Sequence, residues 1–242
     1  MRILLTNDDG INAPGILTLA KWAQSLGEVT VVAPKIEQSG KSHGIEIVRP
    51  IEIKKVDFPL DMPAYAVDST PADCVRYAVK GLGLTFDLVI SGINRGYNVG
   101  EDIMYSGTVG AIFEANAMGI PAMAFSTHPN GFEDAAAHLD RVYQFIVTHK
   151  LFEKHNLYNI NIPANPKSIR ITRQGGPYYK DDFVSKGGDM YLQEGYSVFK
   201  ATGDETLDTE ATLGGHISIL PLTLERTHMG VYSALSHLAE EM

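Results

Sequence analysis

The sequence predicts an α/β protein with a three-layer α/β/α, Rossmann-like architecture built on a mostly parallel sheet. Over the first 165 residues, short apolar runs alternate with longer segments of helical periodicity. This alternation is typical of successive βαβ units, whose parallel strands are covered by helices on both faces. The short runs are almost continuously apolar, as expected for strands that are buried on both sides.

The first elements follow from their local patterns in order. Residues 3–6 and 29–33 are rich in Ile, Leu and Val, which favours buried strands. Between them, residues 14–26 predict an amphipathic helix that begins at a proline. Its apolar positions include Ile16, Leu17, Leu19, Ala20 and Trp22.

The alternation continues through the middle of the chain. A helix is predicted over residues 72–81, because the preceding Asp68-Ser69-Thr70-Pro71 segment places a capping hydroxyl before a proline. Strands are predicted at residues 86–90, 121–125 and 158–162, and helices at residues 109–118 and 134–150. These elements complete the predicted α/β core.

Beyond about residue 166 the pattern changes to strands separated by glycine-containing turns. Strands are predicted at residues 168–172, 191–200 and 216–220, followed by a short helix at 232–242 with Leu235, Leu238 and Met242 on one face. Because this part has few large apolar residues, the chain is predicted to form one domain over residues 1–242. Residues 1–165 are its α/β core, and residues 166–242 form a β-hairpin and helix extension that packs on the core or on another subunit.

Composition limits the classes of function. The chain has 20 Lys and Arg against 29 Asp and Glu, for a net charge of −9, whereas a general nucleic-acid binder needs a basic face. No apolar run reaches the length of a membrane span, and the N-terminus lacks a signal-peptide pattern. Cys74 is the sole cysteine, which excludes an intramolecular disulfide and favours a reducing compartment. A cytoplasmic protein without a membrane or duplex nucleic-acid partner is predicted.

The most informative motif is Asn7-Asp8-Asp9-Gly10, directly after the first predicted strand. Adjacent carboxylates repel each other unless a cation or a shared proton relieves them. They lie at the carboxyl end of a strand, where ligands bind in open α/β sheets. The alternative interpretation is a polar turn in which an aspartate caps the following helix.

Two further strand ends carry oxygen ligands. The segment after residues 29–33 contains Ser39, and the segment after residues 86–90 contains Asn94. The carboxyl ends of parallel strands share one edge, so these oxygens can converge with Asp8 and Asp9 on one ion. Hard oxygen ligands favour Mg²⁺, Mn²⁺ or Ca²⁺.

A fourth segment, Ser106-Gly107-Thr108, leads into the predicted helix at 109–118. Free backbone N–H groups at a helix N-terminus, with two hydroxyl donors, suit a phosphate group. Simple N-capping is the alternative. The long connection over residues 34–45 is a candidate lid or an ordinary exposed turn, and its Lys35, Lys41 and His43 are weaker candidates for anion contacts.

Several common signatures are absent. The chain has no phosphate-loop motif, no GxGxxG after the first strand, no HExxH and no GxSxG elbow. Adjacent Asp8 and Asp9 also differ from the DxD pattern of aspartyl-phosphate phosphatases. These absences weaken the zinc-hydrolase, serine-hydrolase and dinucleotide-binding interpretations.

The motifs resemble those of the survival protein E (SurE) family of nucleotidases. The matching segments are residues 3–10, 32–34 with 39–40, 91–94 with Gly96 and Asn98, 105–109, 159–163 and 218–222. The resemblance implies that Asp8, Asp9, Ser39 and Asn94 hold one divalent metal per subunit. It implies that Asn98, Ser106, Gly107 and Thr108 surround the phosphate. It also implies homodimers or homotetramers in which C-terminal elements cross between subunits.

The resulting prediction is a phosphomonoesterase that hydrolyses nucleoside 5′-monophosphates, with 3′-monophosphates and short polyphosphate as further substrates, using Mg²⁺ or Mn²⁺. Asp8 or Asp9 is predicted to orient or deprotonate the attacking water. The alternatives are a nucleotide-binding regulatory protein with a vestigial site and another metal-dependent ester hydrolase. The residues leave open the preferred base, the choice between 5′ and 3′ phosphate, the physiological metal and the choice between dimer and tetramer.

Overall fold

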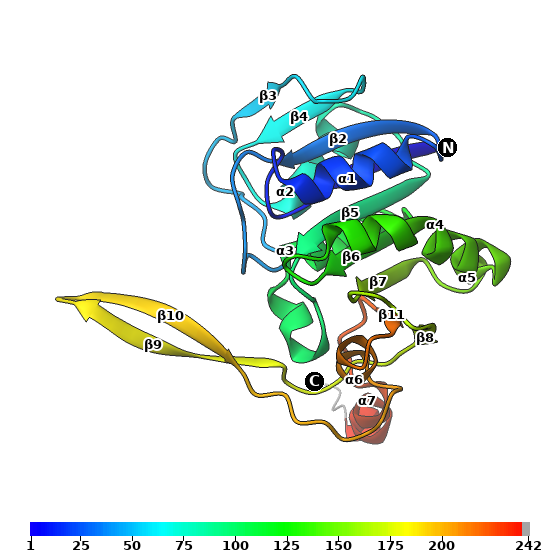
Figure 1. The fold of residues 1–242 in the computed structure, drawn as a ribbon. Helices are drawn as coiled ribbons and strands as arrows, with labels where there is room; N and C mark the ends of the chain where they lie inside the picture. The colour runs from blue at the N-terminus through cyan, green and yellow to red at the C-terminus, as the bar shows by residue number, and fades with distance from the viewer. Residues whose placement is uncertain (239–242) are drawn as a thin grey trace.

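The fold was analysed in a computed structural model that describes residues 1–238 (Figure 1). Within these residues, nine strands form one sheet. They are β1 (Arg2–Thr6), β2 (Glu28–Pro34), β3 (Ile53–Lys55), β4 (Ala64–Val67), β5 (Leu88–Arg95), β6 (Ala122–Thr127), β7 (Leu157–Ile162), β8 (Ile169–Ile171) and β11 (Ile217–Pro221). Their spatial order is β3-β4-β2-β1-β5-β6-β7-β11-β8.

The centre of the sheet is parallel. Parallel pairing joins each strand to the next in the series β4, β2, β1, β5, β6 and β7. Antiparallel pairing occurs toward the two edges, between β3 and β4 and between β11 and β7. The predicted mostly parallel sheet is confirmed, and the carboxyl ends of its central strands share one edge.

Helices cover both faces of the sheet (Figure 1). On one face, α1 (Pro14–Ala23) and α4 (Phe132–Thr148) pack in a core that contains Leu5. On the other face, α2 (Pro71–Arg76) and α3 (Gly107–Ala117) pack in a core that contains Leu4. Neighbouring residues of β1 therefore point into different cores, as expected for a strand buried on both sides. The predicted three-layer α/β/α architecture is confirmed.

The local helix signals are also seen in the structure. Pro14 and Pro71 begin α1 and α2, and the Thr70 hydroxyl accepts a hydrogen bond from the Asp73 N–H. The predicted helix at 72–81 is divided, because α2 is followed by a π-helical turn at Tyr77–Gly81. Within residues 1–238, no helix has the length and apolar character needed to cross a membrane.

The C-terminal part contains an extended ribbon. Strands β9 (Tyr179–Gly187) and β10 (Met190–Ser197) pair antiparallel and project away from the sheet (Figure 1). The remaining elements are α6 (Asp208–Leu213), α7 (Met229–Leu235) and a 3₁₀ turn at Ser236–Leu238. The helix predicted at 232–242 therefore begins earlier and ends at Leu235, and Met242 lies outside the described residues.

Some elements were not predicted from the sequence. They are strands β3, β4 and β9, the short helices α5 (Leu151–Lys154) and α6, and the 3₁₀ segment at Gly100–Tyr105. Most are only three to six residues long, and β9 is largely exposed and charged, so it lacks an apolar pattern. Strand β5 also continues past the predicted end to Arg95, which places Asn94 within the strand rather than after it.

Candidate active site

Four segments meet at the carboxyl edge of the parallel strands. The Asp8 carbonyl, after β1, accepts a hydrogen bond of 2.7 Å from Gln38 N–H in the loop that follows β2. The Ser42 N–H of the same loop donates to the carbonyl of Tyr105, directly before α3, at 3.0 Å. The predicted convergence of the segments after β1 and β2 with the start of α3 is therefore present in the fold.

Asp8 is the buried carboxylate of this edge, with 4% of its surface exposed. Its Oδ1 accepts a hydrogen bond from the Thr108 hydroxyl. Burial raises the pKa of Asp8 to about 6; the Thr108 hydrogen bond opposes this rise, and the charge of Asp9 adds to it. None of the ion pairs formed within residues 1–238 involves Asp8.

Asp9 lines a cavity of about 640 Å³, together with Ser39 and Glu37. Its Oδ2 accepts a hydrogen bond of 3.1 Å from the Arg95 N–H at the end of β5. Burial raises the pKa of Asp9, and the nearby charge of Glu37 raises it further. The Ser39 hydroxyl donates to Glu37 at 2.6 Å. Ser39 and Asp9 therefore share one cavity, and Asp9 is joined to the end of β5.

Asn94 precedes Arg95, whose backbone contacts Asp9. The Asn94 side-chain nitrogen donates to the Gly96 carbonyl at 3.0 Å. This bond orients the amide and leaves the Asn94 Oδ1 as the group that can act as an oxygen ligand.

The N-terminus of α3 lies directly against Asp8. A Cβ atom on Gly107 would lie 2.9 Å from the Asp8 Cβ, so glycine is required for this close approach. Ser106 accepts a hydrogen bond of 3.1 Å from the Val109 N–H, which confirms the capping role considered for it. Its hydroxyl hydrogen still offers a donor. Ser106 and Thr108 are thus both placed at the start of α3, and Thr108 contacts the acidic pair.

Asn98, the remaining predicted phosphate ligand, is buried beyond the end of β5. Its side-chain nitrogen donates to the Ser126 Oγ at 2.9 Å. Asn159 and Asn161 contact its backbone, and neither was predicted as a site residue. Two asparagines at alternate positions of an otherwise apolar strand are the sequence signal that marks them.

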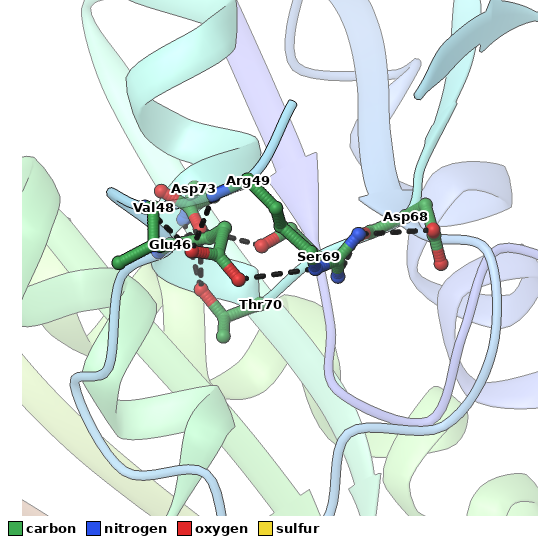
Figure 2. Close-up of polar contacts among 7 residues, drawn as sticks. All are labelled: Glu46, Val48, Arg49, Asp68, Ser69, Thr70 and Asp73. Atoms are coloured by element: carbon green, nitrogen blue, oxygen red, sulfur yellow. Dashed lines mark hydrogen bonds and ion pairs between the residues drawn. The ribbon is translucent and has the colours of Figure 1, made fainter. Parts of the chain in front are cut away.

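The loop after β2, at residues 35–52, is anchored rather than free. The Glu46 N–H donates to Asp73 Oδ2 at 2.8 Å, and the Thr70 hydroxyl donates to the Gly44 carbonyl at 2.7 Å. Arg49 joins Glu46 to Asp68 through ion pairs (Figure 2). These contacts fasten the loop to the start of α2. The loop is therefore held in place by the protein, unlike an unanchored surface turn.

The weaker candidates in this loop have protein partners. His43 Nε2 lies 2.8 Å from the Glu114 carboxylate, which also binds Arg76 at 2.7 Å. His43 and Arg76 both lower the pKa of Glu114, the His43 hydrogen bond being the largest cause. Lys35 pairs with Glu52 at 3.0 Å. His43 therefore ties the loop to α3.

The donor set fits a divalent cation. Within residues 1–238, no three or more His, Cys, Asp and Glu side chains group into a metal site, so a cation here needs hydroxyl and amide oxygens beside the carboxylates. A buried carboxylate without an ion-pair partner, next to a second carboxylate, favours a bound cation. Oxygen-only donors suit Mg²⁺ and Mn²⁺.

A parallel sheet covered on both faces, with a buried carboxylate against a helix N-terminus at the carboxyl edge, defines an α/β protein whose site suits a phosphate group. The family model described as Survival protein SurE matches residues 3–181, and the chain belongs to this family. The family membership predicted from the motifs is thereby confirmed.

Similar proteins cover nearly the whole chain. The 5′-nucleotidase SurE of Natranaerobius thermophilus is 37% identical, over 98% of both chains. The 5′-nucleotidase SurE 1 of Thermus thermophilus is 40% identical, over 99% of this chain and 98% of the relative. The crystal structure of the SurE protein from Aquifex aeolicus superimposes with a TM-score of 0.82 at 35% identity, over 99% of this chain and 100% of that chain.

Proposed function

We propose that this protein is a metal-dependent 5′-nucleotidase, which hydrolyses nucleoside 5′-monophosphates to a nucleoside and phosphate. The observation that carries the proposal is the buried Asp8 carboxylate, held beside Asp9 and against the N-terminus of α3. The similarity to relatives named 5′-nucleotidase supports the same activity.

Asp8, Asp9, Ser39 and Asn94 would hold one divalent cation per subunit, Mg²⁺ or Mn²⁺. When bound, such a cation offsets negative charge on the phosphate and promotes ionisation of water. The hydrogen bonds from Arg95 to Asp9 and from Asn94 to Gly96 orient two of these ligands. The protein therefore supplies a preorganised set of oxygens.

The phosphate would lie at the start of α3. Ser106, Thr108, the first backbone N–H groups of the helix and the Asn98 amide hold its non-reacting oxygens. Asp8 or Asp9 would orient the attacking water and take its proton while the water oxygen forms a bond to phosphorus. The phosphorus–oxygen bond to the nucleoside breaks, and the leaving oxygen takes a proton from the protonated carboxyl group or from solvent. The intact acidic pair favours this turnover over the alternative of a regulatory protein with a vestigial site.

Phosphate release from a panel of nucleotides tests the activity. Nucleoside 5′-monophosphates are expected to be cleaved far better than duplex DNA, because a net charge of −9 repels a polyanion. The panel includes 3′-monophosphates, short polyphosphate and a carboxylester, which separate the proposed activity from other ester hydrolysis. Nucleotide binding without phosphate release would instead identify a regulatory protein.

Removing the hydroxyls at the start of α3 is expected to weaken phosphate binding. Ser106→Ala and Thr108→Val each delete a hydroxyl, and each should raise the Kd for inorganic phosphate by roughly 10-fold, as expected for about 1.4 kcal/mol. The Thr108 hydroxyl donates to Asp8 in this structure, so its contact with phosphate requires that it turns from Asp8 to the anion. Calorimetric titration with phosphate measures this change. Metal affinity should change little in Ser106→Ala, whereas Thr108→Val also removes the hydrogen bond to Asp8, a proposed metal ligand, and should change metal affinity too.

Ser106→Thr is the matched control, because it keeps both the hydroxyl and the helix cap that Ser106 provides. It should bind phosphate nearly as well as the unmodified protein. Loss of metal binding with normal phosphate binding in Ser106→Ala and Thr108→Val would reverse the roles proposed for the two segments.

We further propose a homodimer or homotetramer in which C-terminal elements are exchanged between subunits. The β9–β10 ribbon exposes large apolar side chains, among them Phe183 at 71% and Met190 at 69%. In α7 and the following turn, Leu235 and Leu238 are exposed as well. Exchanged elements bury such surface only in the assembled state.

Deleting residues 231–242 is expected to give a smaller oligomer or aggregation, as measured by light scattering. The paired substitution Leu235→Ser and Leu238→Ser keeps the chain length and should weaken assembly in the same direction. A soluble monomer both before and after truncation would contradict the exchange.

Two further predictions, on the division of the chain and on its cellular location, are also proposals. The division into a core of residues 1–165 and an extension of residues 166–242 rests on the change in sequence pattern. The cytoplasmic location rests on the single Cys74, which favours a reducing compartment.

A further inference from the structure

Strand β7 carries two fully buried asparagines, Asn159 and Asn161. They alternate with Ile160 and Ile162, which belong to the core on the α1 and α4 face. Their side chains therefore point to the opposite face, where α3 packs. Burial of an amide is costly unless it is hydrogen-bonded, so these two side chains need partners on that face.

Their partner is the backbone of one residue, Asn98. The Asn161 side chain accepts from the Asn98 N–H at 2.9 Å and donates to the Asn98 carbonyl at 2.9 Å. The Asn159 side chain donates to the same carbonyl at 2.8 Å. One amide thus binds both polar groups of the Asn98 backbone, and a second amide adds a third bond.

The side chain of Asn98 is held separately. Its nitrogen donates to the Ser126 Oγ at 2.9 Å. This bond uses one of the two N–H groups of the amide and leaves the other for a ligand. Ser126 of β6 lies in register with Asn94 of β5 and Asn161 of β7, so one row of residues crosses three strands beneath the site.

The chain around Asn98 has few other anchors. On one side, the Gly96 N–H donates to the Thr127 carbonyl at 2.8 Å. On the other side, the Gly100 N–H donates to Asp208 at 2.9 Å. Between these two points, Val99 is fully buried, and the hydrogen bonds with Asn159, Asn161 and Ser126 are the polar contacts that hold Asn98.

We infer that Asn161, assisted by Asn159 and Ser126, is a positioning residue that sets Asn98 for contact with the substrate phosphate. The inference rests on the proposed function, because it requires that Asn98 binds phosphate. It adds that β6 and β7, which supply none of the proposed direct ligands, determine phosphate affinity through these three side chains.

The test is a double-mutant cycle of Asn161→Leu and Asn98→Ala in the full-length protein, with Kd for inorganic phosphate and KM for AMP as readouts. Leucine keeps the side-chain volume but removes all the Asn161 hydrogen bonds. Asn161→Leu should raise both constants by roughly 10-fold, equivalent to about 1.4 kcal/mol. In the Asn98→Ala background it should change them less than about 2-fold, because the positioned amide is gone.

A purely structural role is separated by Tyr158→Phe. This variant also removes one hydrogen bond of a buried β7 residue, to the Leu151 carbonyl, but Tyr158 lies on the α1 and α4 face, opposite to Asn161. It should lower the melting temperature and leave phosphate affinity unchanged. Ser126→Ala is the milder second variant, because it removes only the contact with the Asn98 side chain, and it should weaken phosphate binding as well.

The outcomes are distinct. If Asn98→Ala weakens phosphate binding but Asn161→Leu and Ser126→Ala do not, the positioning role is wrong and the phosphate role of Asn98 stands. Additive effects in the double mutant would also overturn the inference. Unchanged phosphate affinity in Asn98→Ala would overturn the phosphate contact itself, whereas absence of nucleotide hydrolysis by the unmodified protein would overturn the proposed function.

Discussion

Asp8→Asn and Asp9→Asn are each expected to lower turnover of a nucleoside 5′-monophosphate by at least ~100-fold, as is typical for essential metal or acid–base groups. Each substitution removes one negative charge from the proposed cation site and one group that can take a proton from water. Steady-state phosphate release at saturating metal measures the loss.

The loss should not come from unfolding. Asp8 is buried next to a second carboxylate, and burial raises its pKa to about 6, so the ionised form is disfavoured in the folded protein. A neutral amide relieves this cost, and the melting temperature of metal-free Asp8→Asn at pH 8 should not fall below that of the metal-free unmodified protein. The sign follows from the raised pKa: the destabilising charge is fully present above about pH 6 and disappears as the pH falls toward 3.8.

Asp87→Asn is the matched control for the acidic pair. Asp87 directly precedes β5, at the opposite end of the strand from Asn94, and it pairs with Arg2. Its substitution should leave turnover nearly unchanged. Near-normal activity of Asp8→Asn or Asp9→Asn, without an added requirement for metal, would show that the site assignment is wrong.

Removal of divalent metal is expected to abolish activity completely. The proposed ligands are all oxygens, so activity should return with Mg²⁺ or Mn²⁺ after dialysis against a chelator. Calorimetric titration of the metal-free protein with Mn²⁺ provides a readout that is independent of turnover. One cation per subunit should bind.

Ligand variants sharpen this prediction. Ser39→Ala and Asn94→Ala each delete one neutral oxygen, so each should raise the metal concentration needed for half-maximal activity more than it lowers activity at saturation. Lys41→Ala, an exposed change in the Ser39 loop, is the control and should behave as the unmodified protein. Hydrolysis that persists in chelator would exclude the metal-dependent mechanism.

Local patterns in the sequence were sufficient for the core of the fold. Continuous apolar runs marked β1, β2 and β6, and the Thr70-Pro71 and Pro14 signals marked helix starts, because caps and strand burial depend on neighbouring residues. The short strand β4 and the exposed β9 lack such signals. Strand β4 pairs with β2, from which it is distant in the sequence, and β9 pairs with β10 outside the apolar core. Neither pairing follows from a local apolar pattern.

The sequence by itself determined the α/β class, the acidic pair at the end of the first strand and the family, since each depends on residues that are close together in the chain. Only the tertiary structure decided that the Thr108 hydroxyl binds Asp8 and that Asn161, on β7 of the same sheet, holds Asn98 beyond the end of β5. These contacts join residues separated by 100 and 63 positions. Buried amides and carboxylates must find partners wherever the folded chain places them, and no local pattern specifies those partners.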